Sequence, residues 1–534
     1  MLREAQAALA QSRATGAPLD EVTAMRAERR PSRRQILTGG GAMAAASIVP
    51  RRSWAIGQPR VAIVGCGIAG LTCAHMLWSK RRIQAQIYEW DDRAGGRIET
   101  LRGYFANGQT TEQHAEFISS EHSATLAMAQ RFGLTLENTY ADPKGVRDTY
   151  WFQGARYDQN ALNRDWMDFG WKLFRDAVRE APGARFDRFS HKAYNWDHMS
   201  VPEWIEKNVP GGLNGDFGRL CYMDTVSEYG GPPESQSALN LIYLLGYDDS
   251  TENGYQSREH PTLGGSDEKW HIKGGNDQLI SGLVSRLPDG TINFGQQLIA
   301  LAENADGSFT CTFDRSGSTV EVVADHVVLT LPFTTLRNVD LSGVTISDLK
   351  RTAIAGLQLG NNVKIQIQVA GRPWTKDGFS GDTITDAAVN GSWDGTTYQS
   401  GHRAETEILI AVPGGSDGAG LAAKYGLVFG QEQGPAPAAL INDTLSQLEP
   451  ILPGITAAWS AGPKLAWVND GNIDEHFLGA WSQYNIGQYT GFCGVERLRE
   501  GNIHFAGEHT SVAFQGFIEG AVRSGERAAK EITS

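Results

Sequence analysis

The chain has 534 residues, a formal net charge of −13, 41% hydrophobic residues and 20% charged residues. This length suffices for two or more domains with large cores, and the composition is ordinary for a globular protein. The acidic balance argues against nucleic-acid binding, which needs basic patches. No apolar run approaches the roughly 18 residues of a membrane span, so we expect no stable membrane insertion. The scattered cysteines and histidines predict neither a disulfide scaffold nor a metal site.

The N-terminal segment does not have the pattern of a folded domain. Residues 1–31 are polar and rich in arginine and alanine, and Arg33-Arg34 precedes a weakly apolar, Gly/Ala-rich run that ends at Val49. A paired arginine before such a run is typical of twin-arginine (Tat) export signals, which carry folded proteins. We therefore expect residues 1–55 to be a signal peptide and disordered leader read by the Tat export machinery, and the protein to be periplasmic or secreted.

The next segment has the pattern of a dinucleotide-binding unit. Val61–Val64 predicts a buried parallel strand, Gly65, Gly67 and Gly70 form G-x-G-x-x-G, and Ile68–Lys80 has apolar residues at helical spacing. The first glycine permits the tight turn, the second lets the backbone approach a pyrophosphate, and the third lets the helix pack close to the strand. The helix start would then present free N–H groups to the phosphates.

An acidic residue follows at the expected place. Gln84–Tyr88 predicts a second strand that ends at Glu89, nineteen residues after Gly70, where a spacing of about 20 is typical. The Glu89 carboxylate would accept hydrogen bonds from a ribose 2′ hydroxyl. Residues 92–97 then read DRAGGR, and an arginine fork suits phosphate oxygens. This segment resembles the R-x-G-G-R element of the flavin amine oxidase superfamily, so the resemblance implies FAD as the cofactor.

The C-terminal part carries a second match to the same family. Residues 501–508 end in F-A-G-E, and residues 516–521 read G-F-I-E-G-A, which closely resembles the family's closing strand and helix. That helix start would bring N–H groups to the pyrimidine end of the flavin, where reduction builds negative charge. The resemblance implies these cofactor-binding residues: Gly65, Gly67, Ile68, Ala69, Gly70, Glu89, Gly95, Gly96, Arg97 at the pyrophosphate, the Leu298 backbone at the adenine, Gly507, Glu508 at the ribityl chain, Phe517, Ile518 and Ala521.

The segments between the two matches predict further elements of the same domain. Residues 280–287 favour a helix, and residues 292–294 and 297–301 favour strands. Residues 309–313 are expected to pair with residues 320–323 around a turn. Residues 324–332 resemble the strand that returns to the FAD domain.

Two charged residues are candidates for the catalytic site. Residues 359–367 alternate in polarity, which predicts a strand, and they resemble the family strand whose lysine holds a water near flavin N5; Lys364 fits that position. Residues 115–118 read A-E-F-I and resemble the A-E-W-I of polyamine oxidases, whose glutamate faces the amines of the substrate. Glu116 is therefore the second candidate. His114 stands where glycine is usual in this family.

The family encloses the substrate amine between two aromatic side chains that face the flavin. By resemblance Phe517 is one of them, and Trp481 in the sequence Gly479-Ala480-Trp481 is the other. Aromatic faces would favour an unhindered, deprotonated amine. Monoamine oxidases attach the flavin through a cysteine next to this wall. Ala480 occupies that position here, so we expect non-covalent FAD.

These observations predict an α/β fold of two domains. A Rossmann-like FAD-binding domain would be formed by residues 58–118, 270–340 and 465–534. A discontinuous substrate-binding domain of mixed sheet and helices would be formed by residues 119–269 and 341–464.

The expected reaction is FAD-dependent oxidative deamination of a primary amine or polyamine by hydride transfer to flavin N5. The imine would hydrolyse to an aldehyde or ketone, and O2 or an electron carrier would reoxidise the flavin. An L-amino acid oxidase is the alternative, and it needs a carboxylate-binding arginine, for which Arg219 is a candidate. A carotenoid-desaturase-like oxidoreductase and a flavin-binding protein without turnover are weaker alternatives. A homodimer is left open.

Overall fold

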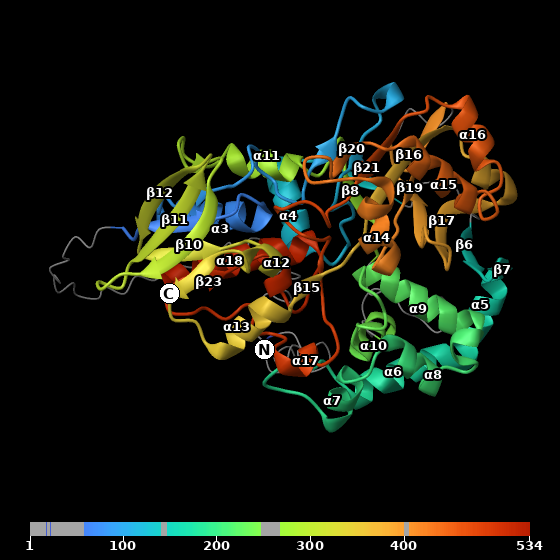
Figure 1. The fold of residues 1–534 in the computed structure, drawn as a ribbon, viewed down its shortest axis with the longest axis horizontal. Coiled ribbons are helices and arrows are strands. Elements are labelled where there is room, and N and C mark those ends of the chain that lie inside the picture. Colours follow the sequence, from blue (N-terminus) through green and yellow to red (C-terminus); the bar gives the residue numbers. More distant parts are fainter. Residues whose placement is uncertain (1–17, 19–21, 23–57, 140–146, 247–266, 400–404) are drawn as a thin grey trace, which may run out of the picture.

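A computed structural model describes residues 18, 22, 58–139, 147–246, 267–399 and 405–534. Figure 1 shows two lobes. One lobe carries α3, α18 and the strands β10, β11 and β12, and the other combines a larger sheet with a group of helices. This arrangement agrees with the two-domain α/β fold that the sequence predicts.

A five-stranded parallel sheet carries the glycine motif at its centre. Its order is β23-β13-β1-β2-β9, with the bounds Ile503–Phe505, His326–Leu329, Val61–Val64, Gln86–Tyr88 and Ile292–Asn293. Helix α3 (Ile68–Arg81) follows β1 and packs against α18 (Ile518–Thr533). β1 is buried along its whole length because strands flank it on both sides and helices cover it. The predicted order of strand, glycine loop, helix and strand is confirmed.

A four-stranded sheet stands beside the parallel one. Its order is β12-β11-β10-β14, with the bounds Ser318–Ala324, Phe309–Arg315, Gln297–Glu303 and Asp340–Gly343. The predicted hairpin is confirmed, because Phe313 pairs with Val320 and Thr310 pairs with Val323. The helix predicted over residues 280–287 is α11 (Gln278–Val284), which begins two residues earlier.

The second lobe is built on an eight-stranded sheet. Its order is β20-β21-β16-β19-β18-β17-β6-β7, with the bounds Gln433–Pro435, Ala466–Asn469, Lys364–Ala370, Thr406–Ala411, Gly391–Asp394, Phe379–Thr385, Arg147–Phe152 and Ala155–Tyr157. Strand β16 lies inside this sheet between β19 and β21, and all but its last residue are buried. The alternation of polar and apolar residues in this strand therefore does not mark a solvent-exposed face, because protein covers both sides of β16.

The single strand predicted over residues 359–367 is interrupted. β15 (Gln358–Leu359) pairs with β22 (Ser482–Gln483), and the next strand, β16, begins only at Lys364. Gly360 lies against the backbone of Tyr229, where any β-carbon would clash with a carbonyl oxygen. This close approach separates the two strands and leaves Lys364 at the first position of β16.

Helices form most of residues 159–246 and recur in the later part of the chain. Those of residues 123–246 are α4 (Ser123–Phe132), α5 (Gln159–Asp165), α6 (Trp171–Glu180), α7 (His191–Asp197), α8 (Val201–Asn208), α9 (Asp216–Tyr229) and α10 (Ala238–Gly246). The later ones include α12 (Phe333–Leu336), α13 (Asp348–Gly356), α14 (Gly415–Tyr425), α15 (Ala438–Leu448), α16 (Ile455–Ala461) and α17 (Gln488–Gly491). The short strand pairs β3 (Thr100–Leu101) with β4 (Thr111–Glu112) and β5 (Leu136–Asn138) with β8 (Trp270–Ile272) complete the element order.

Two elements lie across the predicted domain boundaries. Helix α4 packs on α18 and α11 of the parallel-sheet lobe, although the sequence predicts residues 119–269 in the substrate domain. Strand β21 pairs with β16 in the eight-stranded sheet, although the sequence predicts residues 465–534 in the FAD domain. Each element belongs to the lobe in which it packs, and the local composition does not reveal which lobe that is.

The N-terminal segment is described only at Pro18 and Val22. The Val22 N–H donates to the Pro18 carbonyl oxygen at 3.0 Å, and the Val22 side chain is 1% exposed, packed with Phe514. The remainder of the predicted leader, including Arg33 and Arg34, lies outside the described residues. Among the described residues, no helix combines the length and apolar character needed to cross a membrane.

Candidate active site

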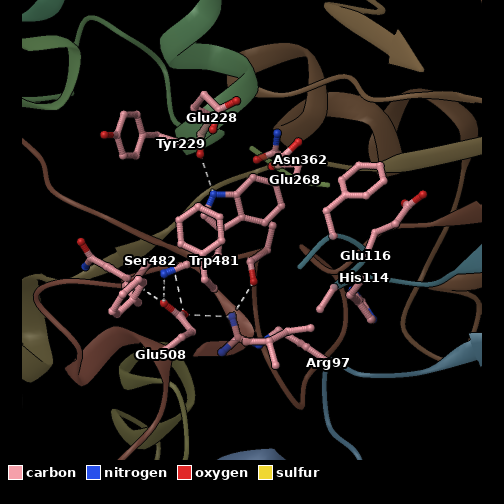
Figure 2. A pocket seen from close by; sticks show the side chains of 18 of the residues that line it. Arg97, His114, Glu116, Glu228, Tyr229, Glu268, Asn362, Trp481, Ser482 and Glu508 are labelled. Carbon is pink, nitrogen blue, oxygen red and sulfur yellow. Dashed lines mark hydrogen bonds and ion pairs between the residues drawn. The ribbon is translucent and has the colours of Figure 1, made fainter. Parts of the chain in front are cut away.

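A cavity of about 1140 Å³ brings together segments from both ends of the chain. The glycine loop after β1, the end of β2, the start of β16 and the start of α18 all contribute to its wall. Figure 2 shows the indole of Trp481 on the cavity wall, with Arg97 and Glu508 on one side of it and Glu228 and Glu268 on the other. Sequence positions more than 400 residues apart thus face one space, as the two distant family matches predict.

The glycine loop has the backbone geometry that the motif predicts. Gly65 has a φ of 105°, and a β-carbon there would clash with the Thr330 hydroxyl. A β-carbon on Gly70 would clash with the Gly65 carbonyl oxygen, so the helix packs on the loop as expected. A β-carbon on Gly67 would lie 3.9 Å from its nearest neighbour, the Gly95 carbonyl oxygen, so the space beside Gly67 is open. Ile68 and Ala69 line the cavity beside it.

Glu89 directly follows β2, and its carboxylate contacts the glycine loop. Its carboxylate accepts hydrogen bonds from the N–H groups of Cys66 at 2.6 Å and Asp91 at 2.9 Å, and it lines the cavity. Burial raises the pKa of Glu89 above its ordinary value, although these two hydrogen bonds oppose that rise. Leu298 lines a smaller neighbouring cavity that shares Gly65 and Glu89 with the main one. Leu298, the predicted adenine contact, therefore lines the same small cavity as Glu89, the predicted ribose contact.

Arg97 connects the two family motifs. Gly95 and Gly96, with φ values of 128° and 56°, turn the chain so that Arg97 lines the cavity. Its Nη1 donates to the Ala480 carbonyl oxygen at 2.6 Å and to Glu508 Oε1 at 3.1 Å. The arginine predicted at the pyrophosphate and the glutamate predicted at the ribityl chain are therefore an ion pair.

Glu508 is held by a full set of donors. The carboxylate accepts from the Ser482 N–H and hydroxyl and from the Gly516 N–H, in addition to Arg97. Burial would raise the pKa of Glu508, but the charge of Arg97 and these hydrogen bonds hold it below its ordinary value. Gly507 precedes it with a φ of 127°. The carboxylate is therefore ionised at neutral pH and fixed in position.

Lys364 and Glu116 are brought together as an ion pair. Lys364 Nζ donates to Glu116 Oε2 at 2.6 Å and to the Glu112 carbonyl oxygen at 3.2 Å. Glu116 also accepts from Trp393 Nε1 at 3.1 Å and from the Tyr398 hydroxyl at 3.4 Å. The two side chains line the cavity and are 9% and 6% exposed as whole residues. Glu116 thus orients Lys364, and the sequence analysis did not predict this ion pair.

Trp481 and Phe517 line the same cavity, as the resemblance implies. Trp481 Nε1 donates to the Glu228 carbonyl oxygen at 2.7 Å, which fixes the plane of the indole. Phe517 lies directly before α18, and its ring centroid is 5.0 Å from that of His122. Both rings therefore have defined positions at the cavity wall.

Several cavity residues were not identified from the sequence. They are Glu228, Glu268, Asn362, Trp393 and His476. The first two come from residues 119–269, where no motif marks a polar side chain as functional. His114 also lines the cavity, and burial lowers its pKa to about 3, so the imidazole is neutral at physiological pH.

Among the described residues, the lysine and arginine side chains that line the cavity are Arg97, Lys364 and Arg372, and each is paired with a carboxylate. Arg372 Nε lies 2.8 Å from Asp394 and 3.4 Å from Glu407, both of which are buried. Arg219, the candidate clamp for an amino-acid carboxylate, does not line this cavity and pairs with Asp386 at 3.5 Å.

The residues at this site fit FAD. The starts of α3 and α18 both line the cavity, and no side-chain hydrogen bond caps either helix. Uncapped helix N-termini carry free N–H groups and partial positive charge, which suit phosphate at one end and a reduced flavin ring at the other. The open face over Gly67 gives a pyrophosphate room to approach the first helix.

Comparison with known proteins agrees with this geometry. The model of the family "flavin containing amine oxidoreductase" matches residues 68–533. Flavin-dependent L-tryptophan oxidase from Lentzea aerocolonigenes is 24% identical over 89% of this chain and 98% of its own length. Flavin-containing amine oxidase B from Cavia porcellus is 21% identical over 88% and 85%. A double mutant of putrescine oxidase, 20% identical, superposes with a TM-score of 0.72 over 89% of this chain and 99% of that one. The chain therefore belongs to the flavin-containing amine oxidoreductase family and is an FAD-dependent amine oxidase or dehydrogenase.

Proposed function

We propose that this enzyme oxidises a primary amine or a polyamine, and not an amino acid. The observation that carries the proposal is the charge of the cavity wall. Each lysine or arginine described on it is held by a carboxylate, which leaves no such cation to bind the carboxylate of an amino acid. The other ionisable side chains on the wall include several acids, among them Glu228 and Glu268, whose pKa values burial raises to about 8. An acidic wall favours a cation.

In the proposed reaction the bond between the α-carbon and one of its hydrogens breaks, and the hydrogen leaves as a hydride. The nitrogen loses a proton, so the amine becomes an imine and gives up two electrons. FAD, when bound, supplies the acceptor for that hydride. Water then converts the imine to an aldehyde or ketone and releases ammonia or an amine. We propose O2, which would yield hydrogen peroxide, or an electron carrier as the final oxidant.

The side chains of this enzyme orient the reactants. Trp481 and Phe517 offer flat apolar surfaces that accept a deprotonated amine and keep water from the reacting carbon. Lys364, which Glu116 holds at 2.6 Å, would bind a water molecule in the cavity. Arg97 and Glu508 fix the loop at Ala480, where no cysteine is present for a covalent flavin bond. Non-covalent FAD therefore remains the proposal.

Anaerobic bleaching of the flavin tests this function directly. The purified holoenzyme would be mixed with alkylamines, arylalkylamines, diamines and L-amino acids, and the loss of flavin absorbance followed. We expect bleaching by amines and none by amino acids. Bleaching by amino acids alone would select the amino acid oxidase, and bleaching by no compound would favour a flavoprotein without turnover. Denaturation with acid should release the FAD into the supernatant, whereas retained yellow colour in the pellet would refute non-covalent binding.

We also propose that the protein is exported in its folded state by the Tat pathway and acts in the periplasm or outside the cell. The proposal is supported by Arg33-Arg34 and the apolar run after them. Replacing both arginines by lysine should leave the flavoprotein in the cytoplasmic fraction, with Arg29→Lys/Arg30→Lys as the matched control. Equal export of both variants would refute the route. Light scattering of the purified protein would test the homodimer.

A further inference from the structure

A histidine lies where the main cavity meets the smaller one beside it. His476 follows β21 and precedes β22, and it lines both the cavity of about 1140 Å³ and the smaller cavity. The smaller cavity also contains Glu89 and Leu298, the predicted contacts of the ribose and the adenine. His476 therefore lines the space that the adenosine diphosphate part of FAD would occupy.

One side of the His476 ring is held by the protein. Its Nδ1 lies 2.7 Å from Asp474 Oδ1, and Asp474 is 5% exposed. The ring centroid lies 4.6 Å from that of Trp90, which also lines the smaller cavity. Nε2 makes no hydrogen bond to another residue that the structure describes. The imidazole is therefore fixed through one nitrogen, and its other nitrogen is left for a ligand.

This pairing decides when Nε2 can donate a hydrogen bond. Burial would raise the pKa of Asp474, but its hydrogen bonds to His476 hold the pKa below its ordinary value, so the carboxylate is ionised. An ionised carboxylate only accepts, so the proton of the neutral imidazole stays on Nδ1 and Nε2 is an acceptor. Nε2 becomes a donor only in the imidazolium. A phosphate oxygen also only accepts, so it can bind Nε2 only when His476 is protonated.

The surroundings favour the protonated form. Burial lowers the pKa of His476, but the hydrogen bond to Asp474 and the charges of Asp474, Asp91 and Glu89 raise it above its ordinary value. The charged and titratable groups around this pair are Asp474, Asp91, Glu89, Glu99, Arg93 and His114.

The acids at this end of the cavity make such a donor necessary. Glu89 and Asp91 both line the main cavity, and a pyrophosphate beside them would add like charge. The nearby Arg93 is held by Asp91 at 3.2 Å and by Glu99 at 2.8 Å. An imidazolium with a free N–H offsets this repulsion and supplies a charge-assisted hydrogen bond.

We propose that His476 is a cofactor-binding residue whose Nε2–H donates to the pyrophosphate of FAD, with Asp474 as its positioning residue. The inference concerns the cofactor, so it does not depend on which substrate the enzyme oxidises. Binding of FAD and protonation of one imidazole are then linked. The affinity for FAD should fall as the pH rises through the pKa of His476, because the donor is lost.

Dissociation of FAD measures this link without turnover. The holoenzyme is diluted at a series of pH values from about 6 to about 9, the range in which imidazoles titrate, and the fluorescence of released FAD gives the Kd. We expect the Kd of the wild type to rise about tenfold across this range, the worth of one charged hydrogen bond. His476→Gln keeps a neutral N–H donor and should show one intermediate Kd at every pH. The exposed His191→Gln on α7 is the matched control and should follow the wild type.

Asp474→Asn tests the positioning role. The variant removes the charge that raises the pKa of His476, so the midpoint of the Kd profile should move to lower pH. The Kd at the lowest pH should change less than about threefold, because the imidazolium still donates there. A carboxylate with only a structural role would weaken FAD binding equally at every pH and leave the midpoint in place.

The outcomes decide the proposal. A wild-type Kd that does not change with pH, or a pH dependence that His476→Gln retains in full, would overturn the phosphate contact. If His476→Gln does not fold, the comparison of wild type with Asp474→Asn still decides, since an unchanged midpoint would overturn the proposal. With FAD saturating, kcat for an amine should stay within about threefold of the wild type in both variants, because the contact lies at the adenosine diphosphate end of the cofactor.

Discussion

The Lys364–Glu116 pair gives the sharpest test of how the site is held together. Replacing Lys364 by methionine removes the cation and leaves Glu116, which is 6% exposed, beside an apolar side chain. At 2.6 Å and an effective dielectric constant of about 20, the attraction between the charges is about 6 kcal/mol. Desolvation offsets part of this attraction, and breaking a buried pair typically costs about 3–5 kcal/mol in unfolding free energy.

For a chain of this size, each kcal/mol lowers the unfolding temperature by roughly 1 °C. We therefore expect Lys364→Met to unfold about 3–5 °C below the wild type, and the double variant Lys364→Met/Glu116→Gln to recover most of that difference. Calorimetry of the holoenzymes gives the coupling. Equal unfolding temperatures for the single and double variants would refute an energetic role of the pair.

The same variants test the chemical role of Lys364. Stopped-flow measurements separate the reduction of the flavin by an amine from its reoxidation. A lysine that holds a water beside the flavin should alter at least one of these two rates by about tenfold or more when replaced. If both rates in Lys364→Met match the wild type, the lysine has only a structural function.

Three further changes test other parts of the site. Gly65→Ala should lose FAD, because the new β-carbon clashes with the Thr330 hydroxyl. The control Gly103→Ala also has a positive φ but meets open space, so it should lower the unfolding free energy by only about 1 kcal/mol. Flavin absorbance per protein measures both variants, and equal loss of FAD would refute the clash. Arg97→Met leaves Glu508 buried without its cation, so FAD affinity should fall about tenfold or more, and an unchanged affinity by titration would contradict the predicted role. In the protein that retains its N-terminal leader, Val22→Asp places a charge at a position that is 1% exposed and packed with Phe514, so it should loosen this contact at the cavity. Faster oxidation of bulky amines is expected, and identical kcat/KM values would refute it.

Much of the cofactor site follows from local sequence. The G-x-G-x-x-G motif determines the turn after β1 through backbone sterics alone, since Gly65 needs a positive φ and Gly70 needs close packing. Apolar periodicity likewise predicts β1 and α3 almost to the residue, because burial of a regular face leaves a regular pattern. The family resemblance added Arg97 and Glu508, but not their ion pair.

The substrate side of the cavity was decided by the tertiary structure. Glu228 and Glu268 lie 40 positions apart in a region without a motif, and either would pass in the sequence for a solvated surface acid. Their raised pKa values arise only when the fold encloses them together and removes water. Local sequence therefore determined how the chain turns around a dinucleotide. Which charges meet in the cavity depended on long-range packing, because desolvation and Coulomb forces act between neighbours in space, whatever their distance along the chain.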